Sequence, residues 1–205
     1  MTEVEDALSQ IAQIRAQLAI GTRFRGYAPE VLFVAAGLSM LAALVQMVWP
    51  ERFATDALGY VTYWGTVLGG IGMLVFAEAI PRTRNHHGEA AIRLLGSSLR
   101  LILPFAAAQA VIALVVCRYA PESTWLVPGL WLIVTALLAS SAVPNLPSAI
   151  LWVALWYFIS GVAVLLAAGR SHALAPWMLG GPFALGNLAI ALILSRSARK
   201  EEYRA

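Results

Sequence analysis

Six long apolar segments follow one another along the chain, separated by short polar or proline-containing stretches. A bilayer core of about 30 Å needs about 20 residues of helix, and each segment is close to that length. Pro50, Pro81, Pro121, "PNLP" and "GRSH" mark the breaks between segments. Because hydrocarbon cannot solvate unpaired backbone groups, the segments are predicted to be transmembrane helices. The predicted spans are 30–49, 57–80, 94–117, 125–143, 148–168 and 173–194, and the predicted fold is an all-α integral membrane bundle.

A different pattern precedes these spans. Val4, Ala7, Ile11, Ile14 and Leu18 recur at alternating spacings of three and four, which places them along one face of a helix. The polar positions of this segment hold more neutral amides than bases, which favours a protein contact over binding to anionic lipid. The chain is therefore divided into a cytoplasmic amphipathic helix with its linker, a transmembrane domain and a short basic tail, at residues 1–26, 27–196 and 197–205.

Composition agrees with a membrane protein, and the distribution of charge predicts its orientation. Only 12% of the 205 residues are charged, against about 25% in soluble domains. Arg52, Arg118 and Arg170 fall on one side of the predicted spans, and the other eleven of the 14 basic residues fall on the opposite side. Since cytoplasmic loops carry the excess of Lys and Arg, both termini are predicted to be cytoplasmic. The near absence of Lys among these bases hints at a bacterial source, and hence the inner membrane.

Aromatic residues gather near the predicted outer interface. An aromatic belt at the lipid headgroups is the expected interpretation. An aromatic-lined pocket that opens outward is the alternative. The residues are Trp49, Tyr60, Tyr119, Trp125 and Trp177.

The residue types that enzymes and metal sites need are sparse. Cys117 is the sole cysteine, so an internal disulfide and a multi-cysteine metal site are excluded. His86 and His87, with Glu89, suggest at most a weak surface metal site, and His172 is predicted to lie on the opposite side of the membrane. No nucleophile with a nearby base is evident. We expect no catalytic activity, no metal and no cofactor, and the scattered arginines do not form a nucleic-acid-binding stripe.

Two charged residues inside the second and third predicted spans form a candidate pair. Glu78 and Arg100 both fall near the cytoplasmic ends of their helices. They are candidates for an intramembrane ion pair, since charges in a bilayer usually find partners. The alternative is that each lies separately at the interface, with Arg100 extending its long stem toward water.

The sixth span contains residues that weaken a helix. Gly180, Gly181 and Pro182 are predicted near mid-membrane, with Asn187 beyond them, and Pro182 cannot donate a backbone hydrogen bond. Interrupted helices often form midplane binding sites in transporters. Pro104 and Gln109 in the third span repeat the same spacing of five residues, so all six residues form a candidate intramembrane site.

Helix packing is the competing explanation, because membrane helices approach closely at small residues. Gly65 and Gly69 form a G-x-x-x-G in the second span. That face would pack against the sixth span, either within one chain or across a dimer. The sequence leaves the binding and packing interpretations open.

Two functional hypotheses follow. The first is a non-catalytic protein of interaction, regulation or sensing, whose partners are the lipid bilayer, a second copy in a dimer, or a cytoplasmic protein bound through the N-terminal helix. The second is a small-solute transporter or channel subunit with its site in the sixth span. The scarcity of charge in the membrane favours the first, because coupled transport usually needs ionisable groups there.

Overall fold

The computed structural model describes residues 28–53, 56–87, 91–143 and 146–202. The predicted N-terminal helix and its apolar seam lie outside these residues. Within the described part there are no strands, and six helices are long and apolar enough to cross a membrane. The prediction of an all-α bundle with six helices that are long and apolar enough to span a membrane is therefore confirmed.

The helices follow the predicted spans in number and order. Five spans are single helices, and the fourth consists of a 3-10 helix, η2 (Pro121–Leu126), that leads directly into α6 (Val127–Ala142). A short helix, α3 (Pro50–Phe53), joins the first span to the second. The five single helices are α2 (Pro29–Val48), α4 (Ala57–His87), α5 (Ala91–Tyr119), α7 (Ile150–Ser171) and α8 (Trp177–Glu202).

Two prolines lie inside helices where the sequence suggested breaks. Pro81, expected to end the second span, lies within α4, which continues to His87. The interruption expected at Pro182 is also absent, because α8 is one helix from Trp177 to Glu202. A proline removes one backbone hydrogen bond, and membrane helices tolerate that loss when neighbouring groups compensate. Proline alone therefore does not locate the helix ends in this chain.

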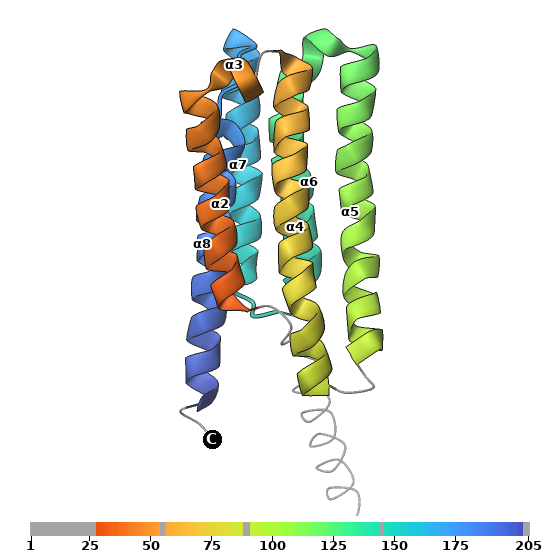
Figure 1. Cartoon of the computed structure of the whole chain (residues 1–205), viewed down its shortest axis with the longest axis vertical. Helices are drawn as coiled ribbons and strands as arrows, with labels where there is room; N and C mark the ends of the chain where they lie inside the picture. The colour runs from red at the N-terminus through yellow and green to blue at the C-terminus, as the bar shows by residue number, and fades with distance from the viewer. Residues whose placement is uncertain (1–27, 54–55, 88–90, 144–145, 203–205) are drawn as a thin grey trace, which may run out of the picture.

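The helices stand side by side and alternate in direction (Figure 1). α2 begins and α8 ends at the same end of the bundle, while α3 lies at the opposite end, which we call the α3 end. α2, α7 and α8 group together, α4 is central in the view with α6 behind it, and α5 lies farthest from α8. The most extensive helix contacts join α6 to α7 and α2 to α8.

Glycines make both of these contacts close. A Cβ atom built on either Gly129 of α6 or Gly161 of α7 would lie 2.9 Å from the carbonyl oxygen of the other residue. A Cβ on Gly180 of α8 would collide with that of Ala43 on α2. Since apolar side chains gain little from leaving lipid for another helix, such close backbone packing is a main source of association between membrane helices.

Burial is uneven across the bundle. In each of α2, α7 and α8, 39% of the apolar stretch is buried, whereas the share is 11% in α4 and zero in α5. The core therefore lies among α2, α6, α7 and α8, together with one face at the beginning of α4. The remaining surface of α4 and nearly all of α5 are left to lipid or to another protein.

Candidate functional site

Three aromatic side chains attach the beginning of α4 to its neighbours. The indole nitrogen of Trp64 donates a 2.8 Å hydrogen bond to Oε1 of Gln46 on α2. The hydroxyl of Tyr63 donates to the carbonyl oxygen of Ala42 at 2.7 Å, and that of Tyr60 donates to the carbonyl oxygen of Ala175 at 3.1 Å. Tyr60 was expected in an interfacial belt, but its side chain is buried in the core, and its hydroxyl pairs with the backbone just before α8.

Gln46 is the residue of this cluster whose hydrogen bonding is incomplete. Its side chain is buried, and its Nε2 atom has no hydrogen-bond partner in the described structure. Buried polar groups are nearly always paired, so this amide costs stability or has a partner such as water or a polar solute. Gln46 was not among the candidates predicted from the sequence, although it has the only side-chain amide between residues 30 and 49.

The glycines of α8 lie at helix contacts. A Cβ on Gly180 would also lie 3.1 Å from the ring of Trp64, while a Cβ on Gly186 would collide with the ring of Tyr157 on α7. Gly181 has open space around it. Both contacts need a residue without a side chain, so the structure gives Gly180 and Gly186 a packing role.

Pro182 lies in the second turn of α8, only five residues after the helix begins. It is therefore closer to the beginning of α8 than to the middle of this helix. Its carbonyl oxygen accepts a 3.1 Å hydrogen bond from the indole nitrogen of Trp156 on α7. Asn187 is partly buried, and its side chain makes no hydrogen bond to another described residue.

The structure does not bring Pro104 and Gln109 to the α8 residues. Both lie on α5, which packs on α4 and α6, whereas α8 packs mainly on α2 and α7. Nε2 of Gln109 donates to the carbonyl oxygen of Trp131 and to Oγ1 of Thr135, each at 3.0 Å, and the indole of Trp131 donates back to the carbonyl oxygen of Gln109 at 2.9 Å. Gln109 thus attaches α5 to α6, and the six residues do not form one site.

The predicted close approach of Gly65 and Gly69 to α8 within one chain is also absent. A Cβ on Gly65 would make an ordinary 3.6 Å contact with Trp131 of α6, and one on Gly69 would have nothing within 4 Å. Gly70 is equally open. This face of α4 is therefore uncovered, and only the dimer version of the prediction remains.

Neither charged candidate site is assembled in the described residues. No ion pair joins Glu78 to Arg100, whose side chain is exposed. Among the side chains described, no three of His, Cys, Asp and Glu come together as a metal site. The side chains of His86, His87 and Glu89 fall outside the described set, so the weak metal site suggested by the sequence stays untested.

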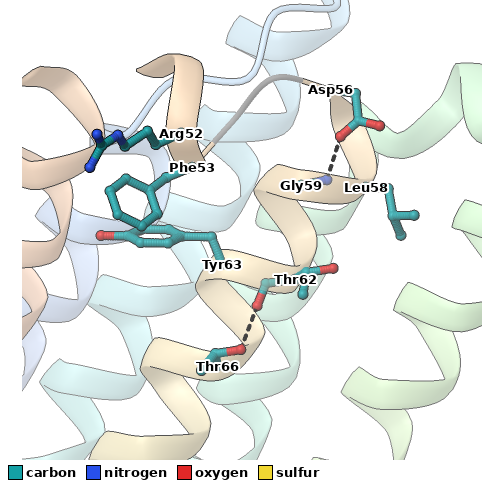
Figure 2. Close-up of a pocket in the computed structure, with 8 residues that line it drawn as sticks. All are labelled: Arg52, Phe53, Asp56, Leu58, Gly59, Thr62, Tyr63 and Thr66. Carbon is teal, nitrogen blue, oxygen red and sulfur yellow. Dashed lines mark hydrogen bonds between the residues drawn. The ribbon is translucent and has the colours of Figure 1, made fainter. Parts of the chain in front are cut away.

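An open groove of about 490 Å³ lies at the α3 end. Figure 2 shows Arg52 on the α3 side of its mouth and Asp56 where α4 starts, with Tyr63 along one wall. The rings of Phe53 and Tyr63 lie 5.1 Å apart and are tilted by 46°. The groove is open on one side. Its lining residues are Arg52, Phe53, Asp56, Leu58, Gly59, Thr62, Tyr63 and Thr66.

The chain matches no protein-family model, no curated protein and no solved structure. Its function is therefore inferred from its own residues and their arrangement.

The pairing of Trp64 with Gln46 yields a stability prediction. Trp64→Phe should lower the free energy of unfolding by about 1–2 kcal/mol, because the whole Gln46 amide then lacks a partner in the interior. Replacing Gln46 with Leu in the same chain should restore part of that loss, since no polar group is then left unpaired. Unfolding of the purified protein in mixed micelles titrated with sodium dodecyl sulfate measures both changes.

Trp152→Phe is the matched control, because Trp152 is 73% exposed and should tolerate the change. The double variant Trp64→Phe/Gln46→Leu could instead lose as much free energy of unfolding as the two single variants together. In that case the Gln46 amide has a stabilising partner other than Trp64, and the prediction is wrong.

Proposed function

We propose that this chain is a small, non-catalytic membrane protein that acts through protein contacts, with a second copy and with a cytoplasmic partner. The observation that carries the proposal is the uncovered glycine face of α4. Gly69 and Gly70 form an open surface on a helix that is otherwise fixed in place. In lipid, such a surface permits the close backbone approach on which helix association depends.

The hydrogen bonds between helices support a fixed platform for such contacts. Tyr60, Tyr63 and Trp64 of α4, Gln109 of α5 and Trp156 of α7 each donate to another helix or to the turn before α8. Each bond of this kind contributes about 0.6 kcal/mol on average in a membrane protein. The intramembrane polar groups are thus largely used to hold the bundle together, which leaves few of them to bind and release a solute.

The orientation belongs to the same proposal. Eleven of the 14 basic residues flank the end at which α2 begins and α8 ends, so this end is assigned to the cytoplasm and the α3 end to the outside of a bacterial inner membrane. The N-terminal segment, with its seam from Val4 to Leu18, is then presented to cytoplasmic proteins.

Self-association through α4 is tested by enlarging Gly69. Gly69→Leu should weaken dimer formation in liposomes about tenfold, because the new side chain separates the two backbones. Energy transfer between labelled copies, measured against dilution in lipid, gives the affinity. Gly37→Leu is the matched control, because Gly37 is also exposed and has nothing within 4 Å of an added Cβ. If Gly69→Leu forms dimers with the same affinity as Gly37→Leu, α4 is excluded as the dimer interface.

The role of the N-terminal segment is tested by deleting residues 1–20. We expect capture of a cytoplasmic partner by cross-linking in cells to be lost, while the six helices still insert. A Glu51→Cys substitution in a Cys117→Ser background monitors insertion and orientation, because Glu51 lies in α3 and is exposed. Labelling by a membrane-impermeant maleimide in intact cells should be the same with and without the deletion. Unchanged partner capture contradicts this role, and absence of labelling contradicts the orientation.

A small-solute transporter or channel subunit is the second candidate, and Gln46 is the observation that favours it. An unpaired amide donor inside the bundle can bind water or a polar solute. Asn187→Cys in the Cys117→Ser background distinguishes the two functions. Rapid labelling of this cysteine by the impermeant maleimide would show water deep in the bundle and favour transport. No labelling from either side, with Glu51→Cys reacting normally, is the result that the interaction proposal expects.

A further inference from the structure

The groove at the α3 end is lined by residues of the first turns of α4. Asp56 immediately precedes α4, and Thr66 is nine residues into the helix, which is about 14 Å along its axis at 1.5 Å per residue. Half of a bilayer core is about 15 Å. Since α4 is long and apolar enough to cross a membrane, a groove of this length along α4 matches the depth of one leaflet. A molecule that fills it needs a polar end and a long apolar extension.

The mouth of the groove carries two opposite charges on different elements. Arg52 comes from α3, and Asp56 from the turn before α4; both side chains are exposed. Oδ1 of Asp56 accepts a 2.7 Å hydrogen bond from the backbone N–H of Gly59, so the carboxylate is held in place as the cap of α4. Neither residue forms an ion pair with another described residue. The two side chains are thus available to a ligand that carries one negative and one positive group.

The lower part of the groove is shaped in advance and is largely apolar. The hydroxyl of Tyr63 is held by the carbonyl oxygen of Ala42, so its ring and that of Phe53 form a fixed wall. The hydroxyl of Thr66 donates to the carbonyl oxygen of Thr62 at 2.8 Å, which satisfies this donor within α4. These side chains already have the positions that an acyl chain would contact, so binding does not have to order them. Such pre-organisation lowers the entropic cost of binding.

We propose that this groove binds a phospholipid whose headgroup is zwitterionic and bears a primary ammonium, as in phosphatidylethanolamine. The phosphate lies at Arg52, the ammonium at the free oxygen of Asp56, and one acyl chain follows Phe53, Tyr63 and Thr66. An ammonium with three N–H donors can bond the carboxylate directly, whereas the methylated ammonium of phosphatidylcholine has no N–H to donate. An anionic lipid without the ammonium meets the repulsion of Asp56. This proposal does not rest on the proposed protein contacts.

Lipid retention by the purified full chain tests the proposal. Native mass spectrometry compares the binding of phosphatidylethanolamine, phosphatidylcholine and phosphatidylglycerol added singly and in pairs. The wild type should prefer phosphatidylethanolamine over the other two about fivefold, as expected for one additional charge contact near the membrane surface. Asp56→Asn keeps a residue that can cap α4 but removes the charge, so this preference should disappear. Arg52→Gln should weaken the binding of all three lipids.

Two matched variants separate this result from other causes. Arg118→Gln removes an exposed arginine at the same end of the bundle but away from the groove, and it should leave lipid binding unchanged. Gly69→Leu should also keep the preference, which distinguishes the lipid site from the α4 dimer face. Equal binding of the three lipids, a preference for phosphatidylglycerol, or a preference unchanged in Asp56→Asn would each overturn the proposal. Size-exclusion profiles verify that the variants remain folded.

Discussion

The position of α4, and with it the groove and the open glycine face, depends on the side chain of Trp64. This residue is completely buried, its indole nitrogen is paired with Gln46 on α2, and its ring lies next to Gly180 on α8. A Cβ atom at Gly180 would be tight against that ring, at 3.1 Å, and would collide with the Cβ of Ala43 on α2. Because a membrane helix gains little hydrophobic stabilisation from leaving lipid, one inserted indole with a hydrogen bond has a large share in fixing where α4 lies.

Tyr63, one residue before Trp64, links this attachment to the outer surface of the same helix. Successive residues of a helix point about 100° apart, so Trp64 can enter the bundle while the ring of Tyr63 forms the wall of the groove. Thr66 and Gly69 then point away from α2 and α8. The hydrogen bond from Tyr63 to Ala42 therefore fixes both the shape of the groove and the direction of the uncovered face.

The six helices could be predicted from the sequence because lipid imposes a strict rule: an apolar segment long enough to cross must pair its own backbone groups. The neighbours of each residue could not be predicted in the same way. Tyr60 and Gln109 look like interfacial and binding residues in the sequence, yet one hydroxyl pairs with Ala175 and one amide pairs with Trp131 and Thr135. Pro182 looks like a helix break, yet α8 continues. These outcomes depend on which helix lies beside which, and a local pattern does not contain that information.

α5 differs from the other helices because none of its apolar stretch is buried and because it is held to α6 through Gln109 and Trp131. Local stability follows the number of buried contacts that must be broken to open a segment. α5 is therefore the span with the least buried apolar surface, and it joins the bundle through its contacts with α4 and α6. The fold thus combines a close-packed core with one peripheral span, whose contact with α6 includes the reciprocal hydrogen bonds of Gln109 and Trp131.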